Sequence, residues 1–177
     1  MSNKNSSFIG YEYIEVPVKQ RYVSLVEDGY ANFGWCLDQA VHSPAGVGSL
    51  TLKFKRDRSI NDKHELAKMQ RRFDEVVREI DHLEQQKTLL ASILAYTIGL
   101  VGTGFMAASV FSITLWTMIP AMVLFAILGF IGWILPYLIF IKVRKTKTLE
   151  LAGSIDEKYD ELYALTKSAN ALIYPSV

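Results

Sequence analysis

The fold of this chain is decided by its longest apolar stretch, from Thr88 to Ile141, which reads TLLASILAYTIGLVGTGFMAASVFSITLWTMIPAMVLFAILGFIGWILPYLIFI. These 54 residues include no Lys, Arg, Asp, Glu or His. One helix crosses the roughly 30 Å hydrocarbon core of a bilayer in about 20 residues, so the stretch is too long for a single span. It predicts two transmembrane helices joined by a tight turn.

The turn is predicted where β-branched and polar residues gather within this stretch. Residues 111–117 read FSITLWT, and Pro120 follows shortly after them. Proline is tolerated in the first turn of a helix, where its missing N–H costs no hydrogen bond. We therefore expect a first span over 88–110, a turn over 111–117 and a second span over 118–141.

Basic residues flank the two predicted spans on one side only. Arg78 and Lys87 precede the first span, and residues 111–117 carry no basic side chain. Four basic residues follow the second span: Lys142, Arg144, Lys145 and Lys147. Because basic residues are retained on the cytoplasmic side, both termini are expected in the cytoplasm. The same four residues suit contact with lipid headgroups.

Composition limits the classes of function. The chain is 50% hydrophobic and 21% charged, and its net charge of +1 argues against a dedicated nucleic-acid binder. Its one cysteine, Cys36, excludes an internal disulfide and suits a reducing cytoplasm. Cys36 and His42 lack the supporting motif of a nucleophile and its base. No catalytic residue, cofactor or metal site is expected, and the chain is not predicted to be an enzyme.

The region before the apolar stretch predicts a disordered start over 1–10 and a small α+β module over 11–58. Apolar and polar residues alternate from Tyr11 to Val18 and from Ser49 to Arg56, as in half-buried strands. Between them, apolar residues from about Gln20 to Leu37 recur at helical spacing. Such a strand–helix–strand module is too small to be stable alone, so it should pack on the following helix, on a second copy or on another protein.

Two further helices are predicted to form a coiled-coil stalk, one over 61–87 and one over 142–172, followed by a tail over 173–177. Their apolar residues recur at steps of three and four, as in a heptad seam. The seam residues are Leu66, Met69, Phe73, Val76, Ile80, Leu149, Ala152, Ile155, Tyr159 and Leu162. An antiparallel pairing of the two seams predicts Arg72 near Glu157. Pairing of each seam with another subunit is the alternative.

Small residues recur on one face of each predicted span. They are Ala91, Ala95, Gly99 and Gly102 in the first span and Ala126, Gly129 and Gly132 in the second. Small side chains let helix backbones approach closely in a membrane, where the hydrophobic effect does not drive helices together. These residues predict helix packing, either within the hairpin or against another membrane protein.

Five short segments stand out: YEYIEVPV over 11–18, NFGW over 32–35, KFKRDR over 53–58, GTGFMA over 102–107 and GFIGWILPY over 129–137. Together they resemble a group of bacterial two-span membrane proteins to which no activity is assigned. The resemblance covers nearly the whole chain. It implies a location in the bacterial plasma membrane, and it implies no activity, cofactor or site residue.

The sequence thus predicts a mainly α membrane protein: a two-helix transmembrane hairpin that continues into a cytoplasmic antiparallel coiled-coil stalk, with a small N-terminal α+β module. The expected function is that of a two-pass scaffold or accessory subunit that presents its head and stalk to a protein partner. The alternative is a pore or transport component formed by oligomerised hairpins. The expected partners are membrane lipids and either another protein or further copies of the chain, and no nucleic acid.

Overall fold

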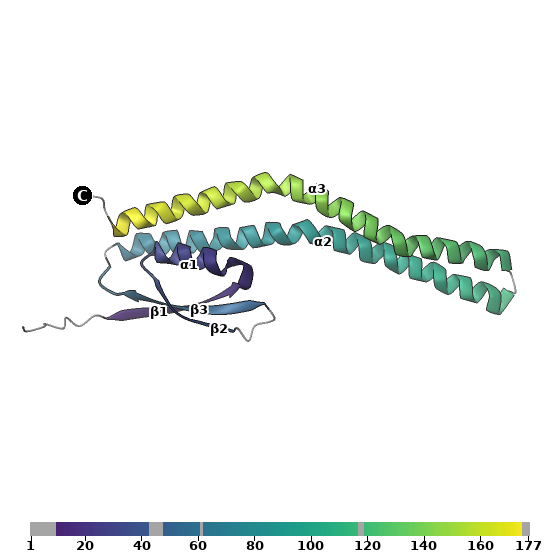
Figure 1. Ribbon diagram of the computed structural model, residues 1–177, viewed down its shortest axis with the longest axis horizontal. Coiled ribbons are helices and arrows are strands. Elements are labelled where there is room, and N and C mark those ends of the chain that lie inside the picture. The colour runs from purple at the N-terminus through teal and green to yellow at the C-terminus, as the bar shows by residue number, and fades with distance from the viewer. Residues whose placement is uncertain (1–9, 43–47, 61, 117–118, 175–177) are drawn as a thin grey trace, which may run out of the picture. The chain divides into compact units, whose positions relative to one another are not determined.

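The computed structural model describes residues 10–42, 48–60, 62–116 and 119–174 (Figure 1). The chain divides into two compact units. The head unit joins Met1–Arg78 with Lys158–Val177, and the hairpin unit is Glu79–Glu157. The predicted disordered start, apart from Gly10, and the end of the predicted tail lie outside the described residues.

The head unit contains a three-stranded antiparallel sheet in the order β1-β3-β2 (Figure 1). β1 (Tyr11–Lys19) and β3 (Ser49–Asp57) pair along their whole length, and both correspond to predicted strands. β2 (Cys36–His42) pairs with the other side of β3 and was not predicted. The predicted strand–helix–strand module is therefore corrected to strand–helix–strand–strand.

The predicted helix over 20–37 is wrong at its C-terminal end. A short 3-10 helix, η1 (Gln20–Tyr22), leads into α1, which covers only Val23–Ala31. Gly34 then adopts a φ of +81°, a left-handed conformation that glycine reaches without a steric penalty. The Trp35 amide donates a hydrogen bond to the Tyr30 carbonyl at 3.0 Å, which closes the end of the helix. The chain therefore leaves the helix before Cys36 and begins β2 there.

The two faces of the sheet differ as alternation predicts. Leu52 and Phe54 of β3 are buried on the face that α1 covers. On the opposite face, Lys53 pairs with Glu15 at 2.8 Å and Lys55 pairs with Asp38 at 2.7 Å. The Asp38 carboxylate raises the pKa of the Lys55 ammonium group. One face of the sheet is thus core, and the other is a half-exposed surface of ion pairs.

Two long helices make up most of the remaining chain: α2 (Lys63–Trp116) and α3 (Ile119–Ile173). The predicted turn over 111–117 is corrected, because residues 111–116 continue α2. Polar residues there do not end the helix, since the hydroxyls of Ser112 and Thr114 donate to the carbonyls four residues before them at 2.8 and 2.9 Å. Asn61, Thr117 and Met118 lie outside the described residues.

Candidate functional site

The candidate site of the head unit is a cluster of aromatic and polar side chains at the junction between the sheet, α1 and the first turns of α2. Phe73 of α2 lies edge-on to Tyr30 and Phe33, with ring centroids 6.1 and 5.7 Å apart. Tyr30 in turn stacks on Phe54 of β3 at 4.7 Å. A Cβ at Gly29 would overlap the Phe73 ring, so the glycine allows α1 to approach α2 closely. The core of the head is therefore shared between the module and α2.

Two polar contacts join the same elements beside these rings. The Trp35 indole N–H donates to Gln70 Oε1 at 2.9 Å in a buried position. The Tyr30 hydroxyl donates to Asp74 Oδ1 at 3.0 Å. Burial raises the pKa of the Tyr30 hydroxyl, and burial also raises the pKa of the Asp74 carboxyl, against the opposing effects of the Tyr30 hydrogen bond and the Arg78 charge. These hydrogen bonds satisfy groups that would be costly to bury alone.

Arg56 is a charged residue that is buried in the head unit, with 6% of its surface exposed. Its guanidinium pairs with Glu12 on the neighbouring strand at 2.6 Å and donates to the Phe33 carbonyl at 3.2 Å. It also lies 4.3 Å from the centre of the Trp35 ring, within the range of a cation–π contact. Arg56 therefore links β1, β3 and the turn that follows α1.

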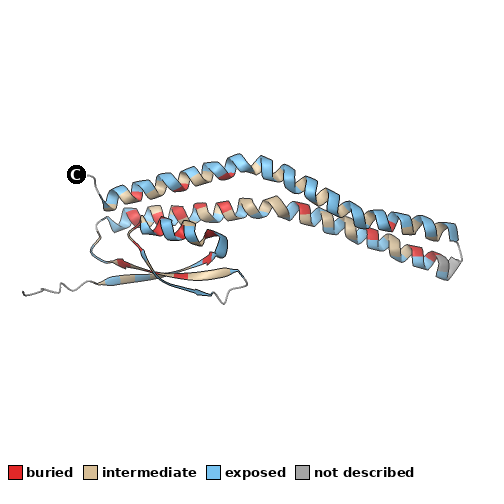
Figure 2. Ribbon diagram, in the orientation of Figure 1, coloured by how far each residue is buried: buried red, intermediate tan, exposed pale blue. Residues whose placement is uncertain are grey.

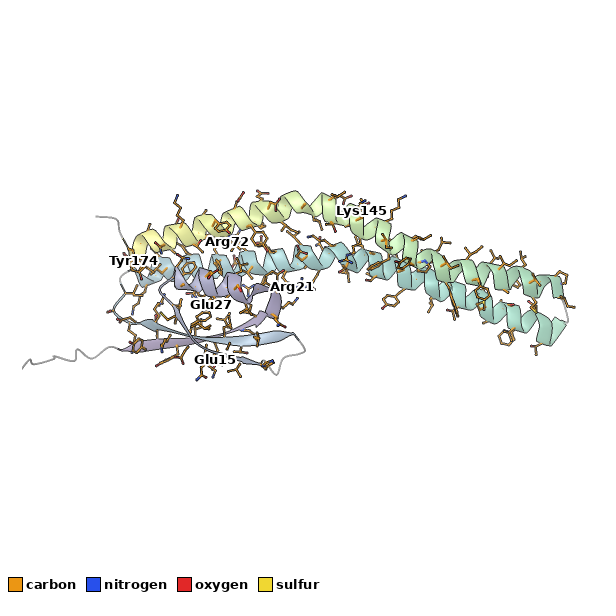
Figure 3. All side chains as sticks on the ribbon, in the orientation of Figure 1. Glu15, Arg21, Glu27, Arg72, Lys145 and Tyr174 are labelled. Carbon is orange, nitrogen blue, oxygen red and sulfur yellow. The ribbon has the colours of Figure 1, made fainter. Side chains whose placement is uncertain are left out.

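The last turns of α3 complete the head unit. Asn170 donates to Asn32 Oδ1 at 3.0 Å, and the Asn32 amide donates to the Asp28 carbonyl at 2.8 Å. Arg72 of α2, labelled in Figure 3, pairs with Glu161 of α3 at 2.6 Å. The predicted partner of Arg72 was Glu157, so the pairing is corrected by about one helical turn. A seam pattern defines which face of a helix is apolar, but a slip of one turn keeps that face and changes the partners.

The residues of the predicted seam fall into three groups. Leu66, Phe73, Val76, Ile80, Ile155 and Leu162 are buried. Met69 and Tyr159 are half-buried, whereas Ala152 is exposed and Leu149 is 71% exposed. Leu149 and Ala152 therefore do not pack against a described residue of this chain, and their placement on a seam stays a prediction. The buried positions Ile155, Leu162 and Ala169 recur every seven residues, so the stripe that packs passes to the side of Leu149.

The small residues predicted to pack helices all lie at buried or half-buried positions of the hairpin unit: Ala91, Ala95, Gly99, Gly102, Ala126, Gly129 and Gly132. A Cβ at Gly132 would lie 2.6 Å from the Gly102 Cα, so the two backbones meet at this pair. Gly129 packs against the side chain of Met106, where a Cβ would lie 2.6 Å from the Met106 sulfur. The Ser109 hydroxyl donates across to the Met122 carbonyl at 2.8 Å. α2 and α3 are thus antiparallel within the hairpin unit.

The outward faces of the hairpin unit are apolar and exposed. Each long helix contains an 18-residue stretch that is apolar enough to cross a membrane. Only 11% of that stretch in α2 and 6% of that stretch in α3 is buried. Figure 2 shows pale blue exposed residues along these helices. Leu100 is 77% exposed, and Trp133 is also exposed. Soluble proteins rarely expose apolar surface on this scale.

The basic residues after the second predicted span are placed at the surface. Lys142, Arg144 and Lys145 are exposed, and Lys145 is labelled in Figure 3. Lys147 is half-buried and pairs with Glu150 one turn along α3. Lys87 pairs with Glu84 at the corresponding position of α2.

Sequence reasoning assigned Arg72 to the stalk with another partner, and it missed four polar residues of the junction: Trp35, Arg56, Gln70 and Asp74. A signal existed for two of them. Gln70 and Asp74 lie four residues apart on α2, beside the predicted seam, so they share a face that packing could bury. Nothing in the sequence indicated that this face would meet Tyr30 and Trp35.

The residues considered for catalysis are not brought together. Cys36 and His42 are exposed at opposite ends of β2, which at about 3.3 Å per residue places them some 20 Å apart. Within the described ranges, no group of three or more His, Cys, Asp or Glu could hold a metal ion. The arrangement of the junction is that of a packed core with satisfied polar groups.

Comparison with protein-family models, with curated proteins and with solved structures finds no match for this chain.

Proposed function

We propose that the chain is a two-pass membrane protein whose hairpin unit anchors a folded head. The observation that supports this most is the exposure of the apolar helix surfaces, since only 11% and 6% of the two apolar stretches is buried by the chain itself. A bilayer would cover these surfaces and contribute about 25 cal/mol for each Å² removed from water. The backbone groups of the two helices are already bonded internally, as spanning a membrane requires.

The proposed orientation places the head in the cytoplasm of a bacterial cell. The exposed basic residues Lys142, Arg144 and Lys145 follow the apolar part of α3 and would lie at the cytoplasmic surface. They would also contact anionic lipid headgroups. The bacterial plasma membrane is the location that the resemblance of the sequence implies.

The proposed activity is contact with a protein partner, as a scaffold or accessory subunit. The sheet of the head offers the surface for it, because one face is free of α1 and carries Tyr11 and Tyr13, which are 46% and 69% exposed. Tyrosine is enriched at the centre of protein interfaces, where its ring is buried and its hydroxyl can bond. β1 is also an edge strand, and an exposed edge can pair with a strand of another protein.

The single cysteine provides the test of topology. Cys36 is exposed in the head, so a membrane-impermeant maleimide should label it in inverted vesicles and not in intact spheroplasts. Thr114 is exposed near the far end of α2, and Thr114→Cys in a Cys36→Ser chain should show the reverse. Labelling of both positions from one side would refute the two-pass proposal.

The partner proposal is tested by native mass spectrometry of the tagged chain after gentle detergent extraction. A second protein should co-purify in a fixed ratio, and the double variant Tyr11→Ala, Tyr13→Ala should lose it while the hairpin stays inserted. Tyr137→Ala, which changes an exposed tyrosine in the hairpin unit, is the matched control. Deleting residues 1–58 is a poorer test, because it would expose Phe73 and the other buried residues at the start of α2.

The second proposal is a pore or transport component built from several hairpins. It is supported by the outer face of α2, where a Cβ at Gly104 would meet open space and Ala107 is exposed, so another helix could approach there. The same mass measurement separates the two proposals. A homo-oligomer without a second protein, together with ion flux in reconstituted vesicles, would favour the pore.

A further inference from the structure

A cavity of about 160 Å³ lies within the head unit, between α1, α2 and the end of α3. An engineered protein cavity of about 150 Å³ holds a benzene molecule, so this one has room for a small ligand. The lining residues that carry the argument are Asp28, Gly29, Phe73, Tyr159, Leu162 and Tyr163. They come from all three helices.

The floor of the cavity is apolar and closely packed. Phe73 and Leu162 are buried, and Phe73 is held edge-on by Tyr30 and Phe33. Gly29 lies directly against the edge of the Phe73 ring, so the ring forms the closed base of the cavity. The ion pair between Arg72 and Glu161 joins α2 to α3 next to this floor.

The walls of the cavity are aromatic and carry negative charge. Tyr159 is half-buried and Tyr163 is 71% exposed, so part of each side chain is accessible to a ligand in the cavity. Asp28 is the charged residue among the described residues that line the cavity. The face of an aromatic ring attracts a cation, and a carboxylate strengthens the attraction. An anion would find no positive side chain among these residues.

We infer that this cavity binds a small organic ammonium ion of about the size of choline, with its cationic group beside the rings of Tyr159 and Tyr163, over the apolar base that Phe73 and Leu162 form, and near the Asp28 carboxylate. The inference goes beyond the proposed scaffold function and does not depend on membrane insertion. Because the ligand would contact Asp28 of α1 and the two tyrosines of α3 together, it would tighten the contact between these helices in the head.

The test is isothermal titration calorimetry on the full chain in detergent. The probes are choline and 3,3-dimethyl-1-butanol, a neutral molecule of nearly the same shape. Choline should bind, and the neutral analogue should bind about tenfold more weakly or not at all, because it lacks the charge that the rings attract. Absence of heat with choline would overturn the inference, and so would equal binding of the two probes.

Two substitutions separate the role of the site from general effects on folding. Asp28→Asn keeps the shape and removes the charge, and Tyr159→Leu keeps an apolar side chain and removes the ring. Each should weaken choline binding by about tenfold. Glu27→Gln is the control, because Glu27 is the exposed neighbour of Asp28 on α1 and does not line the cavity (Figure 3).

Near-ultraviolet circular dichroism of the aromatic junction checks that each variant is folded. Unchanged affinity in folded Asp28→Asn and Tyr159→Leu would overturn the inference. It would also be overturned if Glu27→Gln weakened binding as much as Asp28→Asn, since general electrostatic attraction would then explain the effect.

Discussion

Replacing Phe73 by alanine removes the ring through which α2 enters the core of the head. Phe73 is 1% exposed and contacts the rings of Tyr30 and Phe33. Truncation of a buried phenylalanine to alanine costs about 3–5 kcal/mol, from lost burial and from the space left behind. The free energy of unfolding should therefore fall by at least about 3 kcal/mol.

Trp35 reports on the unfolding of the head. Its indole is buried and bonded to Gln70, so its fluorescence should change when the junction opens. Trp116→Phe and Trp133→Phe make Trp35 the sole tryptophan in the detergent-solubilised full chain. For a domain of about one hundred residues, each kcal/mol of lost stability lowers the midpoint of thermal unfolding by about 4–8 °C. A loss of at least about 3 kcal/mol in Phe73→Ala should therefore lower this midpoint by at least about 12 °C.

The matched control is Phe130→Ala in the same background. Phe130 lies in the hairpin unit and is 57% exposed, so its truncation should leave the Trp35 transition within about 2 °C of the parent. If Phe73→Ala also left the transition unchanged, the head would fold without α2. The reasoning that the helix ends complete its core would then be refuted.

Three further predictions concern pH, helix packing and charge. Burial raises the pKa of the Asp74 carboxyl above its ordinary value of 3.8, so the folded head binds a proton at Asp74 more tightly than the unfolded chain does. Protonation of Asp74 therefore stabilises the head at low pH, and this stabilisation is lost as the pH rises through the pKa of Asp74 in the folded state. Asp74→Asn, whose amide oxygen can still accept the hydrogen bond from Tyr30, should remove this dependence of the unfolding free energy on pH, measured by urea titrations of Trp35 fluorescence. If the free energy of unfolding still fell with rising pH in this variant, another group would be responsible. Gly132→Leu should separate the hairpin helices at Gly102. It should therefore reduce disulfide cross-linking between Ser109→Cys and Met122→Cys in a Cys36→Ser chain, whereas Gly104→Leu, whose side chain would enter open space, should not. Equal cross-linking in the two variants would contradict the close approach of the helices. A double-mutant cycle between Arg72→Ala and Glu161→Ala should give a coupling of about 0.2–1 kcal/mol in the stability of the head, and the cycle that uses Arg71→Ala instead should give none.

Local pattern was sufficient to predict the strands β1 and β3 and the presence of two long apolar helices. Alternation places Leu52 and Phe54 on one face of β3 and Lys53 and Lys55 on the other, because successive side chains of a strand point to opposite faces. An uncharged stretch of this length predicts helices because they satisfy their own backbone groups. These properties depend on neighbours along the chain.

β2 could not be predicted in the same way. Cys36, Asp38, Gln39, Ala40, Val41 and His42 are all exposed, so the strand shows no buried alternation. Leu37 happens to extend the helical period of α1, although the chain turns at Gly34. β2 exists because β3 offers it an edge to pair with, and that edge is supplied by residues later in the sequence.

The same distinction between local pattern and tertiary contact applies to the candidate site. By itself the sequence determined which faces of α2 and α3 are apolar, since a period of three and four residues follows from helix geometry. Only the tertiary structure decided that Arg72 meets Glu161, that Leu149 lies outside the packed stripe, and that Phe73, Gln70 and Asp74 belong to the core of the head. A repeating pattern is unchanged by a shift of one turn, so register and partners depend on contacts between residues far apart in the chain, where the fit of Gly29 against Phe73 and of Asn32 against Asn170 selects one arrangement.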